Sequence, residues 1–241
     1  MKYAVVIPAR YQSSRFPGKP LVDILGKTMI QRVWERCCEA VGAASVYIAT
    51  DSNLIKAKTE SFGGQVIMTS DTCLTGTDRL AEANKILGCD FIINVQGDEP
   101  LINPEDINKL IKAYQENPNT IINAMCSITD EEEFRSFTVP KVVASNSGKL
   151  LYMSRSPVPV TKKGDFVFGY KQVCIYVFSK EHLNFFAAHE NKTRIEDVED
   201  IEILRFLEKD IDVHMIEVQN ASVAVDVPQD VEKVIVLLNK L

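Results

Sequence analysis

The sequence lacks a long basic run, and it also lacks an apolar run long enough to cross a membrane. Its formal net charge is −6, with acidic and basic residues interspersed, so no cationic stripe is available to neutralise nucleic-acid phosphates. No apolar stretch reaches the roughly 20 residues that a transmembrane helix needs. The apolar start of the chain meets Pro8 and Arg10 too early for a signal peptide. We therefore expect a cytoplasmic protein with no nucleic-acid or membrane partner.

Cysteine and histidine are too few and too scattered to predict a metal centre or disulfides. The six cysteines form no C-x-x-C pair and have no neighbouring histidine cluster, which fits neither zinc-ligand spacing nor a disulfide framework. The three histidines all lie in the last quarter of the chain, away from any Ser or Cys motif. We expect the cysteines to be reduced and mostly buried, and the histidines to be core or surface residues.

The first half of the chain alternates short apolar runs with helical patterns. With 241 residues, 46% of them hydrophobic, the chain can bury a substantial core as a single domain over residues 1–241. The expected strands are residues 3–7, 45–49, 65–68 and 91–95, and the expected helices are residues 29–40, 53–62 and 77–87. Continuous apolar strands between helices predict an α/β fold with a doubly wound, mostly parallel sheet.

The second half of the chain departs from this alternation. After a helix at residues 104–116 and a strand at 121–128, three strands at 141–144, 150–152 and 172–178 are joined by turns. Strands joined without helices indicate an antiparallel extension or edge lobe, at about residues 138–180. A helix at 196–207, a strand at 212–218 and a helix at 228–238 are expected to follow.

A loop rich in cations follows the first expected strand. In IPARYQSSRFPGKPL, the cations Arg10, Arg15 and Lys19 lie close to two serines and Gly18. Ligands bind at the carboxyl ends of the strands in α/β sheets, and a loop of cations, hydroxyls and backbone N–H groups suits a triphosphate. The alternative is a solvated basic loop. The loop is neither a Walker loop nor a G-x-G-x-x-G turn.

Carboxylates follow two other apolar runs. In FIINVQGDEP, Asp98 and Glu99 come after a strand, and in SVAVDVPQD, Asp226 follows an apolar run and precedes Pro228. Magnesium prefers a few protein oxygens completed by phosphate and water, so carboxylates from two strand ends could hold one or two ions. The alternative is a turn in which the Asp begins a helix.

Several motifs together resemble one family. The segments IPARYQSSRFPGKPL, ATD, TGTDR and NVQGDEPLI are similar to those of the 3-deoxy-manno-octulosonate (Kdo) cytidylyltransferases, which make CMP-Kdo. The resemblance continues in order through VPKVV, LYMSRSPVP, CIY, EDIEILRFLE and VDVPQDVEKV. It implies the Rossmann-like fold of nucleotide-diphospho-sugar transferases, and an enzyme that transfers CMP from CTP to a 3-deoxy-ulosonic acid used in lipopolysaccharide or other surface polysaccharide.

The resemblance also implies roles for individual residues. Arg10, Lys19, Asp98 and Asp226 would be catalytic, with the two aspartates holding Mg²⁺. The positions matching the CTP site are Ala9, Ser14, Arg15, Thr50, Asp51, Gly76, Thr77, Arg79 and Gln96. The positions matching the sugar site are Arg155, Gln172, Tyr176, Glu202 and Ile203. The antiparallel lobe would bind the sugar and form a homodimer.

The expected sugar site departs from the family pattern. Gln172 stands where His is usual, Cys174 where Gly is usual, and Ile203 where Gln is usual. Because Ile offers no hydrogen bonds, a modified acid such as 8-amino-Kdo is an alternative substrate to Kdo. Two further alternatives are a nucleotidyltransferase for neutral hexose phosphates, which usually presents a different first loop, and a non-catalytic nucleotide-binding module.

Overall fold

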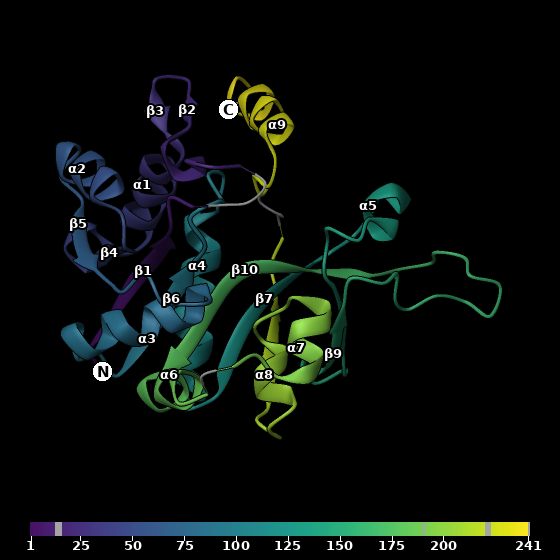
Figure 1. The fold of residues 1–241 in the computed structure, drawn as a ribbon. Helices are drawn as coiled ribbons and strands as arrows, with labels where there is room; N and C mark the ends of the chain where they lie inside the picture. Colours follow the sequence, from purple (N-terminus) through teal and green to yellow (C-terminus); the bar gives the residue numbers. More distant parts are fainter. Residues whose placement is uncertain (13–15, 190, 220–222, 241) are drawn as a thin grey trace.

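A mixed sheet with helices on both faces forms the body of the protein (Figure 1). We analysed a computed structural model, which describes residues 1–12, 16–189, 191–219 and 223–240. The strands are β1 (Tyr3–Ala9), β2 (Asp23–Ile24), β3 (Lys27–Thr28), β4 (Val46–Thr50), β5 (Gln65–Met68), β6 (Phe91–Val95), β7 (Ile121–Ser127), β8 (Lys141–Ala144), β9 (Leu150–Ser154), β10 (Tyr170–Ser179) and β11 (Val213–Glu217). The main sheet has the order β11-β7-β10-β6-β1-β4-β5, with β8 paired to β10 and β9 paired to β8, while β2 and β3 form a separate hairpin.

The helices lie between these strands. They are α1 (Met29–Val41), α2 (Asn53–Ser61), α3 (Gly76–Leu87), α4 (Pro104–Glu116), α5 (Glu131–Arg135), α6 (Lys180–Ala187), α7 (Arg194–Glu199), α8 (Leu204–Leu207) and α9 (Pro228–Leu238), with 3₁₀ turns at Lys19–Leu21 and Ala43–Ser45. Helices α1 and α4 pack on one face of the sheet and α3 and α6 on the other. No helix in the described ranges combines the length and apolar character needed to cross a bilayer.

The sequence-based fold class is confirmed, with two corrections. The strand expected at 172–178 is not part of an edge extension, because β10 lies inside the main sheet, antiparallel to both β6 and β7. The helix expected at 196–207 is two helices, α7 and α8, separated at Asp200, whose φ of 51° ends the first helix. Apolar periodicity alone carries no signal for such a left-handed residue.

A bulge in β10 brings the backbone of this strand next to the end of β6. Its pairing with β7 shifts register between Val173 and Tyr176, and the buried Asn123 amide donates to the carbonyls of Val173 and Ile175 at 3.0 and 2.8 Å. The carbonyl of Cys174, within the bulge, accepts from the backbone N–H of Gln96 at 3.2 Å. The bulge thereby anchors the backbone just after β6.

A separate small core joins distant parts of the chain. Ile24 of β2 and Met29 of α1 pack with Val225 and Val234, the latter from α9. Figure 1 shows α9 beside the β2–β3 hairpin. This contact holds the segment that leads into α9 close to the end of β1.

Candidate active site

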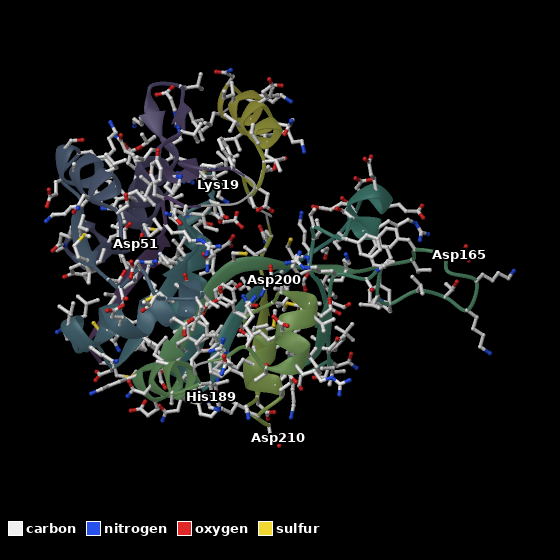
Figure 2. The ribbon with its side chains drawn as sticks, in the orientation of Figure 1. Lys19, Asp51, Asp165, His189, Asp200 and Asp210 are labelled. Atoms are coloured by element: carbon white, nitrogen blue, oxygen red, sulfur yellow. The ribbon has the colours of Figure 1, made fainter. Side chains whose placement is uncertain are left out.

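A cavity of about 390 Å³ opens at the carboxyl ends of β1 and β6. One group of its lining residues comprises residues 8–10, 19–20 and 96–98 with Asp226, and a second group comprises residues 73–76 and 200–202 with Lys192 and Glu196; Met29 and Arg79 line it as well. Figure 2 labels Lys19, in the turn after β1, and Asp200, at the end of α7. The position of the cavity agrees with the rule that α/β sheets bind ligands beyond the carboxyl ends of their strands.

Lys19 and two aspartates form the charged centre of the cavity. The Lys19 ammonium lies 2.7 Å from the Asp98 carboxylate and 3.9 Å from that of Asp226. The backbone N–H of Val225 donates to the carbonyl of Asp98 at 2.9 Å, which joins the two carboxylate-bearing segments. All three charged side chains keep partial exposure, between 15% and 33%. The three groups are therefore fixed yet open to a ligand.

Glycines allow the backbone to approach closely here. Gly18 has a φ of 72°, and its N–H donates to the carbonyl of Tyr11 at 2.9 Å, closing the loop that carries Lys19. A Cβ atom on Gly97 would lie 3.0 Å from the carbonyl oxygen of Pro8. The ends of β1 and β6 can meet at this distance only because residue 97 has no side chain.

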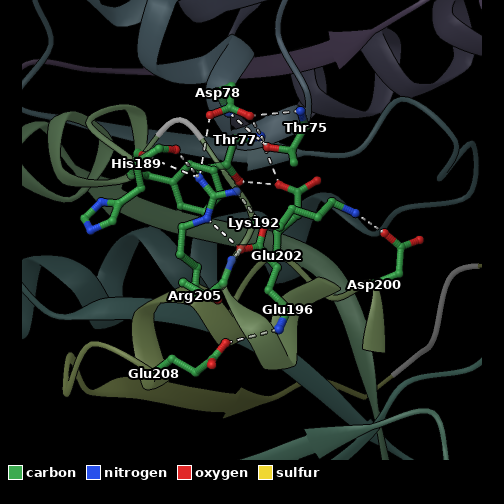
Figure 3. A network of polar contacts seen from close by, with 12 residues as sticks. Thr75, Thr77, Asp78, His189, Lys192, Glu196, Asp200, Glu202, Arg205 and Glu208 are labelled. Atoms are coloured by element: carbon green, nitrogen blue, oxygen red, sulfur yellow. Dashed lines mark hydrogen bonds and ion pairs between the residues drawn. The ribbon is translucent and has the colours of Figure 1, made fainter. Parts of the chain in front are cut away.

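Glu202 binds the N-terminus of α3 from a distant part of the chain (Figure 3). Its carboxylate accepts from the backbone N–H groups of Gly76 and Thr77 at 3.1 and 3.0 Å, and from the Thr77 hydroxyl at 2.5 Å. Burial raises the pKa of the Glu202 carboxyl, although the hydrogen bonds from Thr77 and Gly76 oppose this effect. The first N–H groups of α3, which have no partner within the helix, are thus bound by an anionic carboxylate that also faces the positive end of the helix dipole.

A buried ion pair supports the segment that carries Glu202. The Arg205 guanidinium makes two hydrogen bonds to Glu196, at 2.6 and 2.7 Å, and both residues have no exposed surface. It also donates to the carbonyls of Phe186 and His189 and lies 3.6 Å above the Phe186 ring. Asp78 on α3 lies 3.9 Å away. Arg205 therefore joins α3, α6 and α7 around one charge.

Lys192 and Asp200 lie on this side of the cavity and were not predicted from the sequence. The Lys192 ammonium donates to the Asp200 carboxylate at 2.7 Å. The T-x-x-E pattern from Thr193 to Glu196 was the available signal, since it marks the start of α7 beside Lys192. Charge counting along the chain could not reveal that Lys192 faces the cavity.

Most of the residues predicted for catalysis and for CTP lie at this cavity. Those that line it are Ala9, Arg10, Lys19, Gly76, Arg79, Gln96, Asp98 and Asp226, with Glu202 from the predicted sugar set. Thr77 lies beside it, bound to Glu202, and Asp51, just after Thr50, pairs with Arg79 at 3.3 Å. Ser14 and Arg15 fall outside the described residues.

The remaining residues predicted for the sugar do not line the cavity. Ile203 is 1% exposed in the apolar core, and Tyr176 packs beside Phe178 in the same core. The Gln172 amide donates to Asn123 at 2.9 Å, next to the β10 bulge. Arg155 donates to four backbone carbonyls, those of residues 137, 138, 199 and 200. A role for these four residues in sugar selection stays a prediction.

The six cysteines form no disulfide bonds, as their spacing predicts. All six cysteines are free, and burial raises the pKa of Cys174, which lies near Asp98 and Asp226. Within the described ranges, no group of three or more His, Cys, Asp or Glu side chains is arranged to hold a metal ion. Any metal here would take two carboxylates and complete its shell from substrate and water.

Comparisons with known proteins agree on one enzyme class. The family profile described as cytidylyltransferase matches residues 4–214. The chain is 41% identical to the 8-amino-3,8-dideoxy-manno-octulosonate cytidylyltransferase of Shewanella frigidimarina, over 97% of each chain. It is 42% identical to the 3-deoxy-manno-octulosonate cytidylyltransferase of Geobacter sulfurreducens, over 98% of each. A solved CMP:2-keto-3-deoxy-manno-octonic acid synthetase, in complex with CTP, superposes with a TM-score of 0.92 at 36% identity, covering 100% of this chain and 99% of the other.

Loss of the buried guanidinium should destabilise the fold. We expect Arg205→Ala to lower the free energy of unfolding by about 3–5 kcal/mol, because Glu196 is left as an unpaired buried charge. The matched control is Lys112→Ala, which removes an exposed ion pair with Glu116 and should cost less than about 1 kcal/mol. Urea unfolding followed by circular dichroism measures both. Similar losses in the two variants would contradict the assignment of the Arg205–Glu196 pair as a main support.

Proposed function

The chain belongs to the cytidylyltransferase family, and from this premise we propose that it transfers CMP from CTP to the anomeric hydroxyl of an acidic 3-deoxy sugar. The reaction forms a bond from the sugar oxygen to the α-phosphorus and releases pyrophosphate. The observation that carries the proposal is the meeting of Lys19, Asp98 and Asp226 in one open cavity. Carboxylates beside a cation at the carboxyl edge of the sheet suit the transfer of a nucleotidyl group.

Arg10 and Lys19 are proposed to bind the triphosphate. Both line the same end of the cavity, where their charges could stabilise negative charge that develops on the α-phosphate and the leaving pyrophosphate. Gln96 and Arg79 line it as well and are proposed to contact the nucleoside. A bond between the N–H of Gln96 and the Cys174 carbonyl holds the backbone at this point. A fixed backbone lets these groups act without rearrangement.

The donor set at Asp98 and Asp226 fits a divalent cation. Two partly exposed carboxylates supply hard oxygen donors and leave room for phosphate and water, which is what Mg²⁺ prefers. We propose that these two side chains hold Mg²⁺, whose bound form supplies Lewis-acid polarisation of phosphate oxygens. Lys19 lies between the same carboxylates, so it limits their mutual repulsion before the nucleotide binds.

Two sugars are candidates for the acceptor. The relatives named for 3-deoxy-manno-octulosonate and for its 8-amino analogue are 42% and 41% identical to this chain. Sequence identity therefore does not favour one of these sugars over the other. We propose Kdo as the main substrate, and the 8-amino analogue as the alternative. The product would serve the synthesis of lipopolysaccharide or another surface polysaccharide.

We further propose that the protein is a homodimer, with the region 138–180 as part of the contact. The segment between β9 and β10, which carries Asp165, projects away from the body of the molecule (Figures 1 and 2). Val167 and Phe168 on it are 72% and 58% exposed, and Phe137 nearby is 68% exposed. Apolar side chains on a projecting segment are typical of a contact surface. Light scattering should give the mass of two chains, and the mass of one would contradict the proposal.

The function is tested by pyrophosphate release from CTP. With Mg²⁺ present, we expect pyrophosphate release when Kdo or 8-amino-Kdo is added. We expect none with the phosphate of a neutral hexose, because the proposed nucleophile is the anomeric hydroxyl of a sugar acid. Comparison of kcat/KM for the two acids identifies the preferred one. If the protein bound CTP but released no pyrophosphate from it with any 3-deoxy-ulosonic acid, it would be a nucleotide-binding module and not an enzyme.

The two aspartates are tested by isosteric substitution. Asp98→Asn and Asp226→Asn should each lower kcat by about a hundredfold or more, because the charge that stabilises the reacting phosphate is lost while side-chain size is kept. The exposed Asp71→Asn is the control and should keep wild-type kcat. Thermal unfolding is measured alongside. If either site variant lost thermal stability in step with activity, its aspartate would have a structural role.

A further inference from the structure

Among the described residues that line the cavity, those of the segment 192–202 include one cation. This is Lys192, which lines the cavity together with Glu196, Asp200 and Glu202, and we call these four residues the far end of the cavity. The other cavity-lining cations, Arg10, Lys19 and Arg79, belong to the loop after β1, to the 3₁₀ turn behind it and to α3. If the proposed function holds, an acidic sugar must place its carboxylate in this cavity beside a triphosphate. Recognition of that carboxylate requires a cation that the phosphates do not already use.

Arg155, the residue expected to bind the carboxylate, is occupied elsewhere. Its Nε donates to the carbonyl of Glu199 at 2.5 Å and its Nη2 to that of Asp200 at 3.0 Å. Its Nη1 donates to two further carbonyls, of Phe137 and Thr138. It does not line the cavity. Arg155 thus holds the backbone on which Asp200 is carried, and is not directed toward a ligand.

The anionic groups at this end differ in how firmly they are bound. Glu196 is buried and accepts two hydrogen bonds from Arg205, and the partly buried Glu202 accepts three hydrogen bonds at α3. The Asp200 side chain is 71% exposed, so water can solvate it when Lys192 moves away. An exposed ion pair contributes little to stability, and exchange of its anionic partner costs correspondingly little.

We propose that Lys192 binds the carboxylate of the sugar acid, and that Asp200 holds the ammonium group in position until the sugar arrives. This inference rests on the proposed function. The side chain of Lys192 is 29% exposed and lines the cavity, so a ligand there can reach it. The hydrogen bond to Asp200 raises the pKa of Lys192, so the ammonium is charged near neutral pH. Asp200 lies in the left-handed conformation, which fixes its direction relative to α7.

The test compares an acid with its uncharged derivative. In the wild type, kcat/KM for the preferred sugar acid should exceed that for its carboxamide. Lys192→Met should lower kcat/KM for the acid roughly ten- to a hundredfold, the value of one charged hydrogen bond, and bring the two substrates close together. The KM for CTP should not change. Lys192→Arg should restore part of the preference, and the exposed Lys209→Met is the matched control.

Asp200→Asn separates binding from structure. Asn tolerates the same backbone conformation, so the substitution releases Lys192 and keeps the end of α7, although it also removes the 3.9 Å ion pair between Asp200 and Arg155. The KM for the sugar acid should fall by up to about fivefold, since an exposed pair no longer competes. The inference would be overturned if Asp200→Asn lowered kcat/KM for the sugar acid as much as Lys192→Met does, or if Lys192→Met kept the preference for acid over carboxamide. Failure of the wild type to use any sugar acid would instead refute the proposed function.

Discussion

A guanidinium group sealed from water must find every charge and hydrogen-bond partner within the protein, and Arg205 is in this position. Its partners come from three helices: Glu196 on α7, the carbonyl of Phe186 on α6 and, at longer range, Asp78 on α3. Helix α3 lies far in the sequence from α6 and α7, which follow each other. The arrangement of one whole side of the cavity therefore depends on satisfying a single buried charge.

Charge is distributed unevenly across the cavity. Arg10 and Lys19 lie with Asp98 and Asp226 at one end, so this end can accept both anionic oxygens and a cation that bridges them. At the far end, the carboxylates of Glu196 and Glu202 are bound to Arg205 and to α3. The charge that a ligand meets there therefore depends on Lys192 and Asp200. An occupant with two separate anionic parts fits this layout better than a neutral one.

The sequence was most informative where chemistry lies at strand ends. Asp98 comes shortly after β6, and the loop that leads to Lys19 begins at the end of β1, so a parallel sheet brings both to one edge. The apolar run before Asp226 forms no strand, and the packing of Val225 on Ile24 and Met29 places this carboxylate instead. It was least informative where a residue's role depends on tertiary direction. Ile203 lies between the cavity-lining Glu202 and helix α8, yet it is buried in the core, and no local pattern shows which of these neighbouring residues faces the cavity. The pairing of β10 was missed because hydrophobic pattern gives the existence of a strand but not its neighbours.

The packing of α9 on the β2–β3 hairpin affects when the site can form during synthesis. Val225 and Val234 pack against Ile24 and Met29, and Asp226 follows Val225 directly. A ribosome makes residues 225–238 after every other described strand and helix of the fold. The emerging chain can therefore assemble its sheet, with Lys19 already paired to Asp98, while the second carboxylate is still missing. Competence for chemistry would thus be acquired in a late docking step, after most of the hydrophobic core is closed.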